Sequence, residues 1–257
     1  MKPHSWKNVL ILDDSLYSRN RSKAVELLAR VRDHVEHKYV LGFRMLTLGW
    51  SDGNTFLPVA FSLLSSENEH NRLCGINQRL DKRTTGYKRR MESIKKSTEV
   101  MFDLLRQAQE HGIKARYLLF DSWFAFPAII CKVREHHLHV ICMLKSMKKV
   151  LYTYKGEKMN LDTLYKELLK KPGKAKILAN ASVVIGNDSN GNPVPARILF
   201  VRDRNRSKKW LALLTTDLEL TDEEIIQIYG KRWNIEVFFK TTKSFLNLAK
   251  AFQVKIL

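Results

Sequence analysis

Short apolar runs alternate along the chain with longer stretches of helical spacing, and this alternation predicts a mixed α/β protein. The runs Val9–Leu12, Ala115–Phe120 and Leu138–Leu144 are largely apolar, which is typical of buried strands. In Ser93–Glu110 and Phe124–His136 the apolar positions recur with the period of a helix. Strands that alternate with helices favour a sheet covered by helices on its faces.

Two further strands are predicted to form a hairpin before the first helix. Lys38–Trp50 and Thr55–Leu64 are strand-like, and Ser51–Asn54 between them contains the Asp-Gly pair of a tight turn. Together with Val9–Leu12 they predict three antiparallel strands at the start of the chain. The segment Ser65–Arg90 is polar and basic without a clear period, so we expect a loop there.

The character of the chain changes after residue 144. Short strand-like runs, including Ala179–Ile185 and Arg197–Val201, are separated by polar turns, and a short helix is expected near Leu161–Leu169. This pattern predicts a mostly β insertion at residues 145–209.

A strand and a long helix are expected to close the predicted core. Trp210–Leu214 is apolar and strand-like, and Thr221–Glu224 is a capping box that begins a helix expected to continue through Phe239. The predicted organisation is therefore a core formed by residues 1–144 and 210–257, interrupted by the insertion.

The charge of the chain indicates a polyanionic partner. Among 257 residues there are 45 Lys and Arg against 26 Asp and Glu, which gives a formal charge of +19 and a pI near 9.9. DNA, RNA and an anionic membrane surface all fit such a surplus. No stretch approaches the roughly 20 consecutive apolar residues that cross a bilayer, and the start lacks the apolar core of a signal peptide. We therefore expect a soluble cytoplasmic protein that binds nucleic acid and no membrane.

The three cysteines, Cys74, Cys131 and Cys142, have no framework spacing, so we predict no disulfide. Cys131 and Cys142 flank three histidines, and zinc can use such ligands. Because Cys131 falls in a helical pattern and Cys142 in an apolar strand pattern, buried thiols are the favoured interpretation.

Three carboxylates occur at positions suited to divalent metal ions. Asp13 and Asp121 each follow the end of a predicted strand, and Glu236 lies in the middle of the last predicted helix. Mg²⁺ prefers such oxygen ligands, and two ions about 3.5–4 Å apart can promote phosphodiester chemistry. Taken singly, each residue is also an ordinary turn, cap or surface residue. Together with the basic charge and the element order they suggest an RNase H-like core, which periodicity alone does not separate from other α/β folds.

A motif around the glutamate is more specific. Tyr229, Arg232, Glu236 and Lys243 are separated by two, three and six residues. This spacing resembles the Tyr-Arg-Glu-Lys signature of the DDE transposases of bacterial insertion sequences, in the group called insertion sequence family four. The segments around Asp13 and Asp121 resemble the first- and second-aspartate strands of the same family, so the resemblance covers residues 9–250.

The resemblance implies a fold, a reaction and a metal site. The fold is an RNase H-like α/β core, with a mixed sheet of three antiparallel strands followed by parallel strands, flanking helices, and a β-rich insertion before the catalytic glutamate. The reaction is hydrolysis at a transposon end followed by attack of a 3′-hydroxyl on DNA. Asp13, Asp121 and Glu236 are implied to be the catalytic residues and to bind Mg²⁺ or Mn²⁺, as two ions. Asp13 is preferred as the first catalytic aspartate because the family pattern is Asp, any residue, then Ser or Thr, and here Ser15 completes it. Asp14 remains the alternative, since a shift of one residue in strand register exchanges the two.

The resemblance also implies how DNA is held. Tyr229, Arg232 and Lys243, with Lys240 one turn past the glutamate, are expected near one helix face to contact phosphates; a solvated basic helix is the alternative. Trp210 stands roughly where relatives carry a tryptophan that stacks on a flipped base, although a tryptophan that begins a strand is more often a core residue.

Double-stranded DNA, both transposon ends and target, is the expected partner. Relatives carry a DNA-binding region before the first aspartate and more chain after the last lysine, and we expect this chain to lack both, which leaves its activity open. A full-length protein is expected to act as a dimer in a synaptic complex, in the bacterial cytoplasm near the nucleoid. The alternatives are a catalytically inactive DNA-binding remnant and another RNase H-like nuclease, for example one that acts on RNA.

Overall fold

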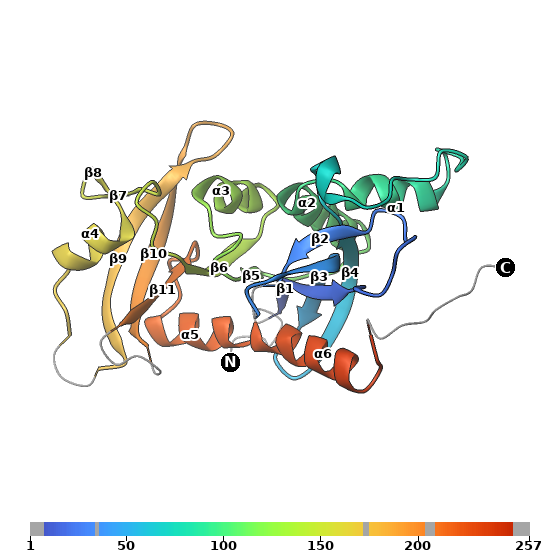
Figure 1. The fold of residues 1–257 in the computed structure, drawn as a ribbon. Coiled ribbons are helices and arrows are strands. Elements are labelled where there is room, and N and C mark those ends of the chain that lie inside the picture. The colour runs from blue at the N-terminus through green and yellow to red at the C-terminus, as the bar shows by residue number, and fades with distance from the viewer. Residues whose placement is uncertain (1–7, 34–35, 172–174, 204–208, 249–257) are drawn as a thin grey trace. The chain divides into compact units, whose positions relative to one another are not determined.

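A computed structural model describes residues 8–33, 36–171, 175–203 and 209–248, which form an α/β protein (Figure 1). The strands are β1 (Val9–Ser18), β2 (Ala29–Arg32), β3 (Tyr39–Ser51), β4 (Phe56–Leu64), β5 (Tyr117–Phe120), β6 (His139–Leu144), β7 (Tyr152–Tyr154), β8 (Glu157–Met159), β9 (Ile177–Asn187), β10 (Pro193–Arg202) and β11 (Trp210–Thr215). The helices are α1 (Thr85–Ser93), α2 (Ser97–Glu110), α3 (Pro127–Glu135), α4 (Leu161–Glu167), α5 (Asp222–Gly230) and α6 (Trp233–Ser244), with one short 3-10 turn, η2 (Glu69–Asn71). Within these ranges, none of the helices combines the length and the apolar character needed to cross a membrane.

The chain forms two compact units, each of which is described by itself. Unit 1 consists of Met1–Ile11, Ser51–Thr55 and Lys114–Trp233, and unit 2 consists of Leu12–Trp50, Phe56–Ile113 and Asn234–Leu257. The predicted insertion, residues 145–209, lies within unit 1. The division of the chain into residues 1–144, 145–209 and 210–257 stays a prediction.

Unit 1 is built on a mixed sheet with helices on both faces. Its strands follow the order β1, β5, β6, β11, β10, β9, β7, β8, with β1 contributing its first residues. Strand β5 is parallel to β1 and to β6, with Ile11 beside Leu119, and the pairs from β6 to β8 are antiparallel. Helices α3 and α5 cover opposite faces around β6 (Figure 1). Because β5 is covered on both sides, all four of its residues, Tyr117–Phe120, are apolar and buried.

Unit 2 has a smaller sheet in the order β2, β3, β1, with β4 also paired to β3. Helices α1 and α2 cover one face of this sheet and α6 the other (Figure 1). The strands β3 and β1 approach closely at Gly42, where an added Cβ would lie 2.3 Å from the carbonyl oxygen of Tyr17. The core is formed by apolar residues of β3 and the buried face of α2, which includes Val100, Met101, Leu104 and Leu105.

Most of the predicted elements are present within a few residues of their expected bounds. The hairpin of β3 and β4 has its turn at Ser51–Asn54, where Gly53 takes a φ of 108° that favours glycine. The capping box at Thr221 and Glu224 begins α5 as predicted, because each side chain accepts a hydrogen bond from the backbone of the other.

Two strand predictions at the start of the chain were wrong. Strand β1 does not end at Asp13 but continues to Ser18, because the polar side chains beyond Leu12 find partners on β3 and α6. Strand β2 was missed, so the opening holds four strands rather than three. Its four residues, Ala29–Arg32, alternate buried and exposed, which is too short a pattern to stand out in the sequence.

Two helix predictions also need correction. Part of the expected loop Ser65–Arg90 is helix α1, which begins where the Thr84 hydroxyl accepts a hydrogen bond from the Tyr87 backbone N–H. The expected single helix through Phe239 is two helices, α5 and α6, separated at Lys231 and Arg232. At this break the backbone N–H groups of these two residues bond three residues back instead of four, and the preceding Gly230 is a weak helix former.

Candidate functional site

The two neighbouring aspartates of β1, both in unit 2, have different surroundings. The carboxylate of Asp14 accepts two hydrogen bonds from the guanidinium of Arg44 on β3, one of them from Nε at 2.6 Å. Such a bidentate pair engages both carboxylate oxygens. Because side chains alternate along a strand, Asp13 and Ser15 lie on the opposite face from Asp14.

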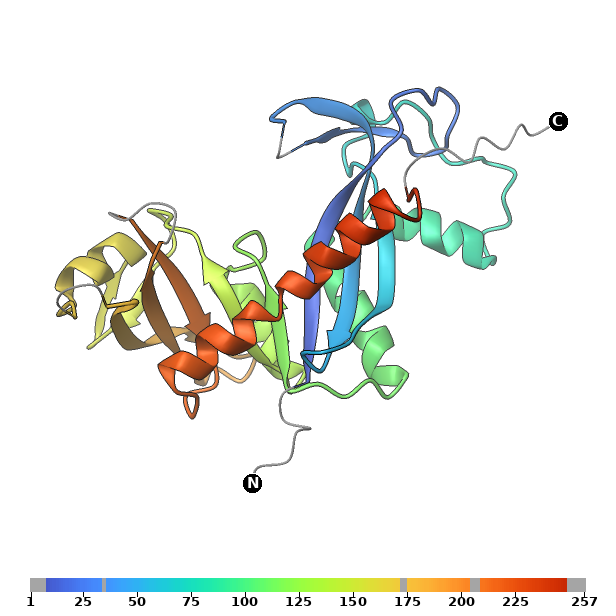
Figure 2. The ribbon, with the colours of Figure 1, turned by 90° about the horizontal axis from the view of Figure 1, so that it is seen from below.

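Helix α6 covers the face of unit 2 that carries Asp13 and Ser15 (Figure 2). Lys243 Nζ donates a hydrogen bond of 2.6 Å to Ser15 Oγ, and the rings of Phe238 and Phe56 pack with centroids 5.3 Å apart. Glu236 lies two turns before Lys243, on the same side of the helix. The glutamate of the signature and Asp13 are therefore carried by the facing surfaces of α6 and β1.

The ammonium of Lys243 is half-buried in this position. Burial lowers the pKa of Lys243 below its ordinary value, while the negative charge of Asp33 acts in the opposite direction. The hydrogen bond to Ser15 joins the ammonium to a neutral hydroxyl and so does not neutralise its charge. Lys240, one turn past Glu236, is exposed.

Asp121 lies in unit 1, directly after β5. Its Oδ1 accepts a hydrogen bond of 2.9 Å from the backbone N–H of Trp123, which fixes the carboxylate in a turn. Tyr229 of α5 lies in the same unit. Burial raises the pKa of its hydroxyl, the positive charge of Arg232 acts in the opposite direction, and the negative charge of Asp121 raises the pKa. The guanidinium of Arg232 is 5.8 Å from the ring centroid of Tyr229. Unit 1 therefore gathers Asp121, Tyr229 and Arg232.

The predicted site residues are thus divided between the units. Unit 2 holds Asp13, Asp14, Glu236, Lys240 and Lys243, and unit 1 holds Asp121, Trp210, Tyr229 and Arg232. The expectation that Tyr229, Arg232, Lys240 and Lys243 lie near one face of a single helix was wrong as to the helix, because Tyr229 belongs to α5, Arg232 lies between the helices, and the two lysines belong to α6. In the part of the chain that the structure describes, no group of three or more His, Cys, Asp or Glu side chains is arranged to hold a metal ion.

Trp210 of β11 packs in an aromatic cluster of unit 1. Its ring lies edge-on to Phe200, with centroids 5.0 Å apart, and 5.2 Å from the ring of Tyr165. These contacts favour the core interpretation, and stacking on a flipped base stays a prediction. Cys131 and Cys142 are buried and Cys74 is half-buried, and all three are free thiols.

Arg44 is the residue of this site that the sequence did not reveal. It stands between Phe43 and Met45 in a strand that is otherwise largely apolar. A single cation in such a strand signals a nearby anion, because a charge is costly to bury unless it is paired. The partner, Asp14, lies on β1, two strands earlier in the sequence, so the apolar pattern alone could not identify it.

These observations define an α/β protein with mixed, mostly antiparallel sheets, flanking helices and carboxylates on strand β1, after strand β5 and on helix α6. Residues 2–163 match the family model described as DDE superfamily endonuclease, and residues 95–252 match the model described as transposase DDE domain. Each match covers more than half of the chain. The chain therefore belongs to the DDE transposases.

Other comparisons are more distant. No curated protein matches the chain. Among solved structures, the Drosophila P element transposase strand transfer complex contains a chain that is 13% identical; the match covers 63% of this chain and 34% of that one, with a TM-score of 0.20. The chain thus spans about a third of that transposase, and a likeness at this level adds nothing to the family assignment.

Proposed function

We propose that the chain is the catalytic core of a cut-and-paste DNA transposase with an RNase H-like fold, from the insertion sequence family four group. It would cleave phosphodiester bonds at transposon ends and join the resulting 3′-hydroxyl to DNA. The family assignment supports the class, and the spacing of Tyr229, Arg232, Glu236 and Lys243 supports the subgroup. The observation that carries the proposal is the bond from Lys243 to Ser15, because it links the signature helix to the strand of the first aspartate.

The proposed cofactor is Mg²⁺ or Mn²⁺, as two ions, with Asp13, Asp121 and Glu236 as ligands. Their carboxylate oxygens are the hard donors that these ions prefer. When bound, the ions would activate the attacking oxygen and stabilise the departing one. Asp14 is less suited, because Arg44 engages both of its oxygens.

The protein orients the two aspartates in similar ways. Asp13 Oδ1 accepts a hydrogen bond of 2.8 Å from the backbone N–H of Asp14, and Asp121 Oδ1 accepts one of 2.9 Å from that of Trp123. A carboxylate that is fixed by backbone groups needs little reorganisation when it binds a ligand.

The basic residues of the signature would hold DNA. Arg232 can bind a phosphate with two parallel hydrogen bonds, whereas Lys240 and Lys243 act as point charges. Tyr229 would support Arg232 through the contact of its ring with the guanidinium. We propose double-stranded DNA as substrate and target, a dimer in a synaptic complex for the full-length protein, and a bacterial cytoplasm near the nucleoid as the location.

A nicking assay tests the enzyme proposal. The substrate is a supercoiled plasmid that carries the DNA flanking the reading frame, incubated with Mg²⁺ or Mn²⁺. Glu236→Gln keeps the size of the side chain but removes its charge, and we expect nicking about a thousandfold slower. Glu110→Gln, an exposed glutamate at the end of α2, is the matched control and is expected to retain the wild-type rate.

The outcomes separate the alternatives. DNA binding without metal-dependent nicking, in the wild type and in both variants, would indicate a catalytically inactive remnant and refute the enzyme proposal for this chain. Degradation of RNA–DNA hybrids without joining of ends to plasmid DNA would instead indicate another RNase H-like nuclease.

A further inference from the structure

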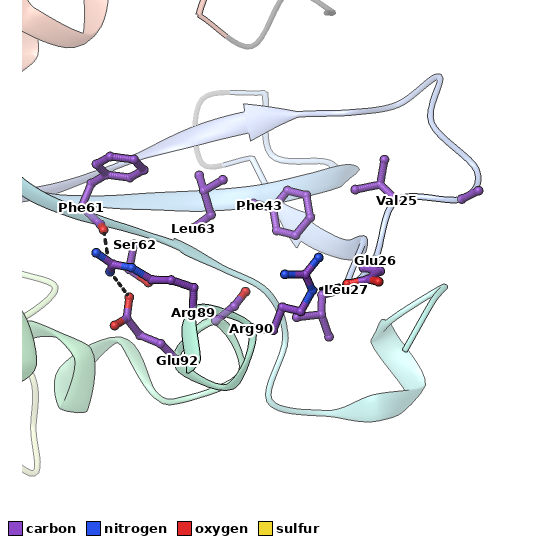
Figure 3. A pocket seen from close by; sticks show the side chains of 12 residues that line it. Val25, Glu26, Leu27, Phe43, Phe61, Ser62, Leu63, Arg89, Arg90 and Glu92 are labelled. Carbon is purple, nitrogen blue, oxygen red and sulfur yellow. Dashed lines mark hydrogen bonds and ion pairs between the residues drawn. The ribbon is translucent and has the colours of Figure 1, made fainter. Parts of the chain in front are cut away.

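Unit 2 contains a cavity of about 650 Å³ on the side of its sheet that helix α1 covers (Figure 3). It lies between α1, strands β3 and β4, and residues 24–27. Its volume falls within the range of about 300–1,000 Å³ that is usual for small-ligand pockets. Since α6 covers the other face of this sheet, the cavity is separate from the face of β1 that carries Asp13.

The cavity has an aromatic mouth and a buried apolar floor. Phe43 and Leu27 form the floor and are 7% and 4% exposed. Phe61 of β4 stands at one end of the cavity, as Figure 3 shows, and is 55% exposed. A phenylalanine that exposes so much of its ring beside an apolar floor offers a flat surface on which another ring can stack.

Two ion pairs form the polar wall. Arg89 pairs with Glu92 at 2.9 Å, and Arg90 pairs with Glu26 (Figure 3). The two arginines and two glutamates of the lining carry no net charge together. The cavity therefore suits a neutral ring with hydrogen-bond donors and acceptors on its edge better than it suits an anion.

The surroundings of the cavity, in contrast, are strongly basic. Residues 82–96 contain seven Lys or Arg and one acidic residue, Glu92. Arg83 and Lys96 in this segment have side chains that are 91% and 60% exposed, and they form surface ion pairs with Asp81 and Glu67. A neutral pocket beside a basic surface matches a nucleotide, whose base is neutral and whose phosphate is anionic.

We propose that this cavity binds one unpaired base of a DNA strand, which stacks on Phe61 while its phosphates lie along residues 82–96. The edge of the base would meet the donors of Arg89 and the acceptors of Glu92, the ion pair that lies beside Phe61 in Figure 3. An apolar protein segment fits less well, because it would bury both ion pairs and would leave the basic segment unused. DNA as the partner rests on the proposed function, but the binding of a base here requires neither metal nor cleavage.

The test measures the affinity of the whole chain for DNA by fluorescence anisotropy, without metal and with a chelator. The probes are single-stranded oligothymidylate, a sugar–phosphate strand of the same length without bases, and a duplex. We expect Phe61→Ala to weaken oligothymidylate binding on the order of tenfold or more. The dependence of affinity on salt should stay unchanged, since stacking neutralises no phosphate.

Leu57→Ala is the matched control. Leu57 lies on the same strand, is 52% exposed and is not part of the cavity lining, so its loss removes a comparable exposed apolar surface. We expect it to change oligothymidylate binding less than about twofold. Equal weakening by the two variants, or wild-type affinity for the strand without bases equal to that for oligothymidylate, would overturn the proposal.

A second measurement does not depend on the folding of a variant. Oligonucleotides that carry 5-iodouracil are photo-cross-linked to the wild-type protein, and the expected product is a peptide that contains Phe61. Cross-links confined to other peptides would refute the proposal, as would a Phe61→Ala variant that binds DNA normally but changes self-association. A negative nicking assay together with a positive cross-link would reject only the enzyme proposal.

Discussion

Asp217 of unit 1 is held differently from Asp13 and Glu236 of unit 2. In unit 1, Asp217 is 2% exposed and accepts hydrogen bonds of 2.8 Å from both the hydroxyl of Tyr117 and the guanidinium of Arg116, and one from the Glu219 backbone N–H. In unit 2, Asp13 and Glu236 are half-buried and lie on facing surfaces of β1 and α6.

This difference separates a structural carboxylate from one that can bind a ligand. Burying Asp217 is tolerated because Arg116 and Tyr117 replace the water that its carboxylate loses. A half-buried carboxylate such as Asp13 is oriented by the protein and still accessible from solvent. Asp14 combines features of both, since it lies next to Asp13 but is held by Arg44.

The largest expected effect is on the rate of nicking, when the same substitution is made at each of the two neighbouring aspartates. Asp13→Asn is expected to slow metal-dependent nicking about a thousandfold, because it removes a proposed metal ligand. Asp14→Asn is expected to slow nicking less than about tenfold but to lower the free energy of unfolding by about 1–2 kcal/mol, because the charge-assisted bonds to Arg44 are weakened. Nicking rates and urea denaturation of both variants measure the two effects.

The reverse pattern would contradict the comparison between these two residues. If Asp14→Asn abolished nicking while Asp13→Asn retained it, the ion pair with Arg44 would have to open during the reaction. Arg44→Met is the informative control, since it removes the partner of Asp14 and leaves both aspartates in place.

The sequence was most informative where a signal is local. The capping box at Thr221 and the turn at Gly53 are set by residues within one turn of each other, and both were predicted. The spacing of Glu236 and Lys243 likewise places them on one side of a helix wherever that helix packs.

What the sequence did not reveal depends on contacts between distant residues. Asp13 and Asp14 are equivalent in the apolar pattern, and only the pairing of β1 with β3 brings Arg44 to one of them. The break between α5 and α6 was missed because the apolar period continues through it. At this break Lys231 Nζ donates a hydrogen bond of 3.0 Å to the carbonyl oxygen of Asp52, a residue 179 positions earlier.

A second prediction concerns the structural carboxylate of unit 1. Asp217→Ala is expected to lower the free energy of unfolding by about 2–3 kcal/mol, because it leaves the hydroxyl of Tyr117 and the charge of Arg116 without their acceptor. The value is below that of a fully buried pair because the Arg116 side chain is 43% exposed. Glu167→Ala at the exposed end of α4 is the control, with an expected change within about 0.5 kcal/mol. Equal urea midpoints for the two variants would show that the network does not stabilise unit 1.

The smallest expected effect tests whether the same polar network makes unit 1 sensitive to pH. Burial lowers the pKa of His139 below 6.5, and the positive charge of Arg134 lowers it further, while Asp217 acts in the opposite direction. Its buried Nδ1 has no hydrogen-bond partner among the residues that the structure describes. As the pH falls below 6.5, the unfolded chain takes up the proton before the folded one does, so the free energy of unfolding falls.

His139→Phe keeps a ring of similar size and removes this titration. The variant is therefore expected to lose less stability than the wild type between about pH 7.5 and pH 5.5, measured by urea denaturation at both values. His70→Phe, at an exposed position of unit 2, is the control. This variant is expected to lose as much stability between the two pH values as the wild type does. If His139→Phe kept the wild-type dependence as well, proton uptake elsewhere in the chain would account for the loss of stability. The polar network of unit 1 would then stabilise the fold equally at both pH values.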